Sequence, residues 1–173
     1  MKIPVVKEIL SANNQLALEN ADLFQKNKIL VINIMASPGA GKTCLILSVI
    51  EELRKVLRFG VIEGDIASSI DADKIGEAGI PVVQINTGGG CHLDAAMIGN
   101  CLQHLDLPAL DVLFIENVGN LICPASYKLG EKLSLVMGHV AEGHDKPHKY
   151  PAIFAAADLV VLTVDGVKGL YVS

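Results

Sequence analysis

The chain has 173 residues, of which 51% are hydrophobic, and it carries a formal net charge of −5. This length suits one domain, residues 1–173, with a hydrophobic core. The acidic balance argues against a nucleic-acid-binding protein and against attraction to an anionic membrane. No apolar run approaches the ~20 residues that span a bilayer. The opening Met1–Pro4 lacks the apolar core of a signal peptide, so we expect a cytoplasmic protein whose four cysteines stay reduced.

The first predicted element is a helix over residues 4–26, with its pattern clearest from Val5 to Phe24. Ile9, Leu16 and Leu23 recur at a spacing of seven residues, with Val6 and Ala12 near the same face. We expect this apolar face to pack on the sheet or on a partner protein, and of the two we favour a plain covering helix.

The next stretch has the order strand, glycine loop, helix. An apolar strand, Ile29–Met35, leads into the loop Ala36–Thr43, and a helix is predicted from Lys42 to about Arg58. Such a loop binds phosphate, because its glycines let backbone N–H groups approach the anion at a helix N-terminus. The full pattern begins with Gly, and here Ala36 occupies that position.

The loop chemistry assigns roles to particular side chains. Lys42 reaches the β- and γ-phosphates, and the Thr43 hydroxyl ligates Mg²⁺. We predict Cys44 to be a small buried thiol on the helix that follows. The predicted nucleotide-binding residues of this stretch are Ser37, Pro38, Gly39, Ala40, Gly41, Lys42, Thr43 and Cys44.

A second strand, Phe59–Glu63, ends at Gly64-Asp65. A carboxylate just past a strand lies at the carboxyl edge of the sheet, where α/β proteins bind ligands. Asp65 is therefore a candidate to hold Mg²⁺ or to position water. Asp71 or Asp73 could be the N-cap of the next helix, which ends near Gly79. The strand Val82–Asn86 follows.

A glycine-rich loop, Thr87–Gly90, leads to Cys91 and His92 at the start of a helix predicted from Leu93 to about His104. A thiolate beside an imidazole is a soft ligand pair that suits nickel, zinc or copper, and a helix N-terminus lowers a thiol pKa. Two ligands do not complete a metal site, so an incidental Cys-His pair remains an equal alternative.

The strand Asp111–Glu116 ends in a carboxylate followed three residues later by Gly119. This is the layout of a γ-phosphate sensor, in which the carboxylate contacts Mg²⁺ through water and the glycine N–H meets the phosphate. Cys123 lies in the same loop and offers a third soft ligand. The predicted catalytic residues are Lys42, Asp65 and Glu116, and the predicted Mg²⁺ ligands are Thr43, Asp65 and Glu116.

The remaining predicted elements are the strand Leu133–Val140, a short helix Pro151–Ala157 and the strand Asp158–Val164. The histidines at 139, 144 and 148 are spaced too loosely to favour a metal site over an exposed loop. Together the elements predict an α/β protein with the three-layer P-loop NTPase fold, in which a mainly parallel sheet has helices on both faces.

These motifs resemble one family along almost the whole chain: the HypB family of nickel-incorporation GTPases in hydrogenase maturation, which are SIMIBI-class P-loop GTPases. The matching stretches are Lys2–Val6, Ser37–Thr43, Glu63–Asp65, Cys91–Ala95, Glu116–Leu121, Cys123–Ala125, Asp145–Pro147 and Lys149–Pro151. The phosphate loop alone indicates only an NTPase, whereas the stretches around Cys91 and Glu116 are specific to the family.

The resemblance implies a GTPase that uses GTP and Mg²⁺, dimerises with nucleotide bound and passes nickel toward a hydrogenase large-subunit precursor. It implies a Ni²⁺ or Zn²⁺ site of Cys91, His92 and Cys123, shared across the dimer. The partner of the family is a small nickel- and zinc-binding maturation protein, and some members also serve urease.

The sequence departs from the family at both ends. It has neither the cysteine-rich motif nor the histidine tract that some members carry before the first helix. The family continues after the last strand with Asn/Thr-Lys-x-Asp, whose Asp pairs with guanine, but here the chain reads Thr163-Val164-Asp165. The lysine is absent and Asp165 falls one residue early. We therefore expect a C-terminal truncation or a shifted reading frame, with an exposed sheet edge and weak GTP selectivity.

Three functions from different classes are compatible with the sequence. The main hypothesis is slow GTP hydrolysis coupled to nickel delivery. The second is a nickel- or zinc-binding carrier with an impaired nucleotide site. The third, a P-loop kinase of small molecules, leaves Cys91, His92 and Cys123 without a role.

Overall fold

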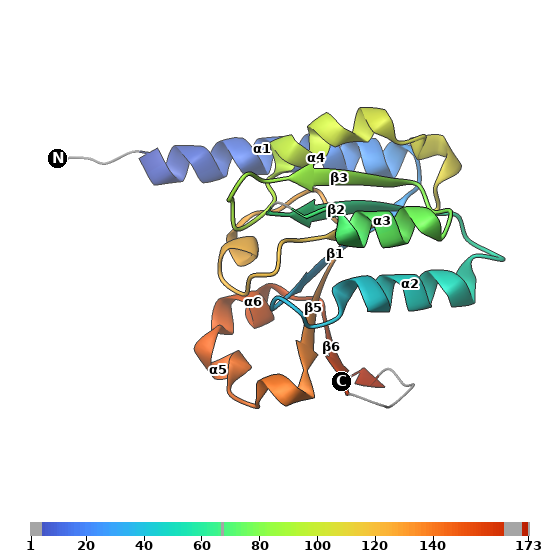
Figure 1. Cartoon of the computed structure of the whole chain (residues 1–173). Helices are drawn as coiled ribbons and strands as arrows, with labels where there is room; N and C mark the ends of the chain where they lie inside the picture. The colour runs from blue at the N-terminus through green and yellow to red at the C-terminus, as the bar shows by residue number, and fades with distance from the viewer. Residues whose placement is uncertain (1–4, 67, 165–170, 173) are drawn as a thin grey trace.

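A computed structural model describes residues 5–66, 68–164 and 171–172 (Figure 1). The helices are α1 (Val5–Lys26), α2 (Lys42–Leu53), α3 (Ile70–Glu77), α4 (Ala95–Cys101), α5 (Lys146–Lys149) and α6 (Pro151–Ala156). The strands are β1 (Leu30–Ala36), β2 (Phe59–Asp65), β3 (Val82–Asn86), β4 (Val112–Glu116), β5 (Leu133–His139), β6 (Leu159–Thr163) and β7 (Tyr171–Val172). None of the described helices combines the length and the apolar character needed to cross a membrane.

The strands form one sheet in the order β3-β2-β4-β1-β5-β6-β7. The first six are parallel to one another, and β7 pairs antiparallel with β6. The register places Glu116 opposite Glu63 on one side and opposite Ile34 on the other. All carboxyl ends of the parallel strands therefore meet at one edge, the position at which this class of sheet binds ligands.

Helices cover both faces of the sheet. Ile34 packs in one cluster with Ile46 and Ile50 of α2, whereas its neighbour Met35 packs in another with Ile153 of α6. This is the alternation that a strand imposes on successive side chains. Helices α1 and α4 lie side by side over the sheet (Figure 1), in the cluster that contains Phe24 and Ile98. The predicted three-layer arrangement is confirmed.

Two predicted helix limits are wrong for local reasons. Helix α2 ends at Leu53 instead of Arg58, because the backbone N–H and guanidinium of Arg58 bond the Asp111 carboxylate at 2.8–2.9 Å and fix the entry into β2. Helix α4 begins at Ala95 instead of Leu93, because Asp94 is its N-cap and accepts the Met97 N–H at 2.8 Å.

Neither Asp71 nor Asp73 caps α3. Both lie in its first turn, and Ser69 occupies the N-cap position. Asp71 instead pairs with Lys74 at 2.8 Å, and Asp73 accepts a hydrogen bond from the Ser69 hydroxyl at 3.0 Å. Acidic side chains in a first turn complement the positive end of the helix dipole, so these two residues stabilise the helix start without capping it.

The predicted inner face of α1 is also wrong. Leu16 and Leu23 are 37% and 38% exposed, whereas Asn13 and Asn20 are only 6% and 7% exposed. Ala17 and Phe24 complete the buried face. The spacing of apolar residues predicted the wrong buried face, because two polar residues on the true buried face, both asparagines, form hydrogen bonds with backbone groups of other segments.

Three further expectations concern Cys44, the edge of the sheet and Asp165. Cys44 is exposed on α2, so the prediction of a buried thiol is wrong. The predicted open sheet edge is partly covered, because β7 pairs with Val161 and Leu162 of β6. Asp165, the displaced base-reading carboxylate of the sequence prediction, lies outside the described residues.

Candidate functional site

The loop between β1 and α2 has the backbone form that phosphate binding requires. Gly39 and Gly41 have φ angles of 74° and 91°, in the left-handed region that side chains rarely adopt. Gly41 is the N-cap of α2, and no side chain of the described residues accepts a hydrogen bond there. The first N–H groups of α2 are therefore available to an anion.

Lys42, Thr43 and Glu116 come together beside this loop. The Thr43 hydroxyl donates to Glu116 Oε1 at 3.0 Å, and Lys42 Nζ lies 3.9 Å from the same oxygen. All three residues are at most 9% exposed. Burial raises the pKa of Glu116, against the opposing effects of Lys42 and the Thr43 hydrogen bond. The structure thus gathers one cation, one hydroxyl and one carboxylate at the expected phosphate position.

Sequence reasoning missed a second buried carboxylate, Glu63. It lies in β2 opposite Glu116 and is 2% exposed. Burial, followed by the nearby charges of Glu116, Asp65 and Asp71, raises the pKa of Glu63 to about 8. A glutamate at the end of an otherwise apolar strand was the signal in the sequence that could have identified it.

These carboxylates fit a divalent cation. Among the described residues, Glu63 Oε2 and Glu116 Oε2 are buried without a hydrogen-bond partner. Buried acceptors of this kind need a compensating donor or cation. Asp65 ends β2 at the same sheet edge and accepts the Ser68 N–H at 2.7 Å. The donor set of hydroxyl and carboxylate oxygens is the kind that Mg²⁺ prefers.

Gly119 lies against the phosphate loop. A Cβ atom on Gly119 would come within 2.9 Å of Pro38 Cα and 3.0 Å of Pro38 N, so only glycine fits without a backbone shift. Movement at the phosphate loop is therefore sterically linked to the loop that begins after β4.

Lys146 of α5 also contacts the phosphate loop, although the sequence analysis assigned it no role of its own. It donates to the Ser37 hydroxyl at 3.3 Å.

The predicted soft ligands form the one group of three or more potential metal ligands found within the described part of the chain. The ligand atoms of Cys91, His92 and Cys123 all lie within 4.8 Å of one another. The two sulfur atoms are 2.8 Å apart as free thiols, and His92 Nδ1 is 3.6 Å from Cys91 Sγ. The His92 ring stacks on Tyr127 at 3.8 Å between centroids. The loosely spaced histidines at 139, 144 and 148 join no such cluster among these residues.

The pKa shifts of Cys123 and His92 have other causes than, or another direction from, the shift of the Cys101 thiol. The hydrogen bond that Cys123 shares with Cys91 raises the pKa of Cys123, and burial lowers the pKa of His92. Cys101 is buried in α4, where burial raises its pKa to about 12. Cys101 therefore suits a structural role, whereas His92 is available as a neutral ligand near pH 7.

Side-chain amides connect the metal-ligand cluster to the strand that carries Glu116. Asn117 Oδ1 accepts the N–H groups of Leu93 at 3.2 Å and Val118 at 3.0 Å. Asn120 Nδ2 donates to the Cys91 carbonyl at 3.1 Å. The loop that contains Gly119 is thus bonded directly to the loop that contains Cys91 and His92.

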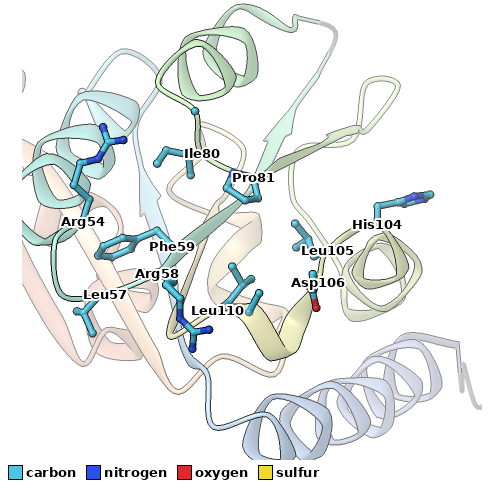
Figure 2. Close-up of a pocket in the computed structure, with 12 residues that line it drawn as sticks. Arg54, Leu57, Arg58, Phe59, Ile80, Pro81, His104, Leu105, Asp106 and Leu110 are labelled. Carbon is cyan, nitrogen blue, oxygen red and sulfur yellow. The ribbon is translucent and has the colours of Figure 1, made fainter.

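A cavity of about 320 Å³ lies at the opposite edge of the sheet, beside the amino ends of β2, β3 and β4. Figure 2 shows Arg58, Phe59, Pro81 and Leu110 around it. The Arg58 guanidinium is already paired with Asp111 at 2.8 Å, which neutralises its charge. This cavity contains none of the predicted site residues, so we place the candidate site at the carboxyl edge.

Comparison with known proteins identifies the family. The model described as "CobW/HypB/UreG, nucleotide-binding domain" matches residues 30–167, which is more than half of the chain. The hydrogenase/urease maturation factor HypB of Helicobacter hepaticus is 43% identical over 165 residues, which cover 93% of this chain and 67% of that protein. The chain belongs to the HypB family.

Two further relatives define the extent of this similarity. The hydrogenase maturation factor HypB of Rhizobium leguminosarum bv. viciae is 49% identical over 160 residues, covering 92% of this chain but 54% of that protein. The chain thus spans about half the length of this HypB. The crystal structure of HypB from Helicobacter pylori in complex with nickel superposes with a TM-score of 0.82 at 41% identity, covering 86% of this chain and 70% of that one.

Proposed function

We propose that this chain is the GTPase module of a nickel-delivery protein. It binds and hydrolyses GTP with Mg²⁺ and assists nickel insertion during the maturation of [NiFe]-hydrogenase in the cytoplasm. One observation carries the proposal: three soft ligand atoms, from Cys91, His92 and Cys123, lie within 4.8 Å of one another. The names of the HypB relatives and the nickel complex of the Helicobacter pylori protein support it.

The nucleotide chemistry is assigned to the phosphate loop and its carboxylates. Lys42 and the backbone N–H groups from Gly39 to Thr43 would bind the phosphates and offset their charge. Thr43, Asp65 and Glu116 would hold Mg²⁺, which supplies charge neutralisation and fixes the phosphate oxygens when bound. Asp65 and Glu116 would also orient a water molecule for hydrolysis.

The metal chemistry is assigned to the two thiols and the imidazole. Cys91 and Cys123 bind as thiolates and His92 as a neutral ring, a donor set that suits Ni²⁺ or Zn²⁺. Three protein ligands leave a coordination position open to another donor. An incompletely filled coordination sphere suits a metal that is cargo, because the recipient can begin to bind before the chain releases it.

The partners follow from the same proposal. We infer a homodimer in the nucleotide-bound state, with the metal site of Cys91, His92 and Cys123 shared across the dimer. A small nickel- and zinc-binding maturation protein would supply the metal, and a hydrogenase large-subunit precursor would receive it. Urease is an alternative recipient, since the Helicobacter hepaticus relative carries both names.

GTP affinity and phosphate release from GTP, both measured with Mg²⁺ on the unsubstituted chain and on Lys42→Ala, test the proposed GTPase activity. Loss of a charge-assisted contact should weaken GTP binding by roughly one to two orders of magnitude. Metal binding to the isolated monomer should stay nearly unchanged, because no described contact joins Lys42 to the metal cluster. Wild-type GTP affinity in Lys42→Ala would contradict the phosphate-loop assignment. Metal binding without GTP turnover in the unsubstituted chain would favour the carrier alternative.

A further inference from the structure

Two asparagines on the inner face of α1 each bond two distant segments of the chain. Asn13 Oδ1 accepts the Ala95 N–H at 2.9 Å, and Asn13 Nδ2 donates to the Lys128 carbonyl at 2.9 Å. Asn20 Nδ2 donates to the Ala95 carbonyl at 2.9 Å and to the Leu129 carbonyl at 3.0 Å. Both asparagines are buried, and they lie seven residues apart on one face of the helix.

The two segments held in this way are those that carry the metal ligands. Ala95 follows Cys91 and His92 by a few residues, at the first position of α4. Lys128 and Leu129 follow Cys123 after a 3₁₀ turn and Tyr127, the ring on which His92 stacks. Each asparagine therefore joins the segment of Cys91 and His92 to the segment of Cys123.

The chemistry of the positions requires an amide. Asn13 must accept from an N–H group and donate to a carbonyl at the same time, which only one orientation of the amide can satisfy. Asn20 faces two carbonyls and must donate to both. The approach is close as well, since a Cβ on Gly130 would lie 2.8 Å from the Ala17 carbonyl oxygen and 2.9 Å from the Ala21 nitrogen. Helix α1 thus has little freedom to shift against residues 128–130.

We propose that α1 is a positioning element of the metal site, and that Asn13 and Asn20 set the distance between the two ligand-bearing segments. This inference rests on the proposed metal-binding function. The two asparagines do not touch the metal and are positioning residues. Groups that hold metal ligands in place from outside the ligand set typically change metal affinity 10- to 100-fold when they are substituted. A change in the packing of α1 would then change the affinity of the site for its metal.

The test compares the Ni²⁺ affinity of Asn13→Leu, Asn20→Leu and the double variant. Binding is measured by the thiolate-to-nickel charge-transfer absorbance. Asn14→Leu is the matched control, because Asn14 is the next residue on α1, is exposed, and its side chain makes no described hydrogen bond. We expect the double variant to bind Ni²⁺ at least about tenfold more weakly. Its GTP affinity should stay within about twofold of that of the unsubstituted chain. A general loss of structure would instead weaken both Ni²⁺ binding and GTP binding.

A metal-free measurement supports the same comparison. Hydrogen exchange at the Ala95 amide should speed up in Asn13→Leu and remain unchanged in Asn14→Leu, because only the first loses the acceptor. If the leucine variants fail to fold, Asn20→Asp retains the shape but loses both donors. Its added negative charge favours cation binding, so weaker Ni²⁺ affinity in Asn20→Asp would be strong support.

Folded Asn13 and Asn20 variants with the Ni²⁺ affinity of the unsubstituted chain would overturn this inference and leave the proposed function intact. Failure of the unsubstituted chain to bind Ni²⁺ at Cys91, His92 and Cys123 would contradict the proposed function, and there would then be no site for α1 to position.

Discussion

At the residue scale, the feature with the largest electrostatic consequence is the pair Glu63 and Glu116. These side chains lie opposite each other on neighbouring strands, each at most 3% exposed, with Lys42 as the nearby cation. Two buried carboxylates beside one ammonium cannot both ionise without a large penalty. Burial and the charge of Glu116 accordingly favour a protonated Glu63.

This predicts a pH dependence of stability. The pKa of Glu63 is about 8 in the folded protein, above the ordinary value of 4.5. The folded chain therefore retains a proton that the unfolded chain releases, and the free energy of unfolding decreases as pH rises between these values, by at most about 1.4 kcal/mol per pH unit. Glu63→Gln keeps the neutral form at every pH. In urea unfolding without Mg²⁺, the unsubstituted chain should lose about 2 kcal/mol more than the variant between pH 6 and pH 8.

Equal losses in the two proteins would show that Glu63 is ionised in the folded state. The Glu116 pKa is also raised, so some pH dependence should remain in the variant.

The metal ligands predict a second pH effect. Thiolates and a neutral imidazole bind metal, so protons compete with Ni²⁺. The pKa of His92 is lowered by burial, and that of Cys123 is raised by its hydrogen bond with Cys91. Proton competition above pH 7 therefore comes mainly from the Cys123 thiol, because the His92 ring is already neutral there. Ni²⁺ titrations between pH 6.5 and pH 8 should show affinity rising by about tenfold or more per pH unit. Affinity that is independent of pH would exclude thiolate ligation.

Sequence reasoning predicted the backbone form of the loop, because the spacing of Gly39 and Gly41 calls for left-handed φ angles that the structure has. The nucleotide-binding roles of Lys42 and Thr43 stay predictions. Sequence reasoning failed at Glu63 and Cys44, since burial depends on the neighbouring strands and helices. A glutamate in a strand and a cysteine in a helix are each compatible with burial or exposure in a single sequence.

At the element scale, the loops after β1 and β4 touch through Pro38 and Gly119. Backbone atoms of Pro38 leave no room for a Cβ on Gly119. The loop after β4 also bonds the Cys91 segment through Asn117 and Asn120. Its conformation should therefore affect both the phosphate site and the metal ligands.

Gly119→Ala tests this contact. The added methyl group must displace one of the two loops, and we expect a loss of stability of roughly 1–3 kcal/mol together with at least tenfold slower GTP turnover. Gly76→Ala is the control, because the added Cβ would lie 3.7 Å from Val82 Cγ1, an ordinary contact, and alanine has a higher helix propensity than glycine in α3. Urea unfolding and phosphate release measure both effects. Unchanged turnover in Gly119→Ala would contradict the proposed role of this loop.

The elements themselves were largely predictable, because apolar runs bounded by glycine or charged residues mark the strands. The predicted Val82–Asn86 strand has the observed limits, and the Asp111–Glu116 strand differs by one residue. The orientation of α1 was not predictable from periodicity. Its buried Asn13 and Asn20 are polar, and their partners at residues 95, 128 and 129 lie far away in the sequence.

At the scale of the whole molecule, the strand order brings the site together. Residues 42, 63 and 116 come from separate segments that meet because β4 lies between β1 and β2. The loops after β3 and β4 place Cys91 and Cys123 side by side in the same way. A single sequence does not reveal which strands pair over such separations, so the family resemblance had to supply the three-ligand set.

The central claim is that one chain joins a phosphate loop to a nickel site of Cys91, His92 and Cys123. Ni²⁺ titration of the unsubstituted chain, Cys123→Ser and Cys101→Ser tests it most directly, by thiolate-to-nickel absorbance. We predict one Ni²⁺ per metal site, affinity lower by roughly two orders of magnitude in Cys123→Ser, and no change in Cys101→Ser, whose thiol is buried in α4 away from the cluster. Equal losses in the two variants, or no thiolate band in the unsubstituted chain, would contradict the account.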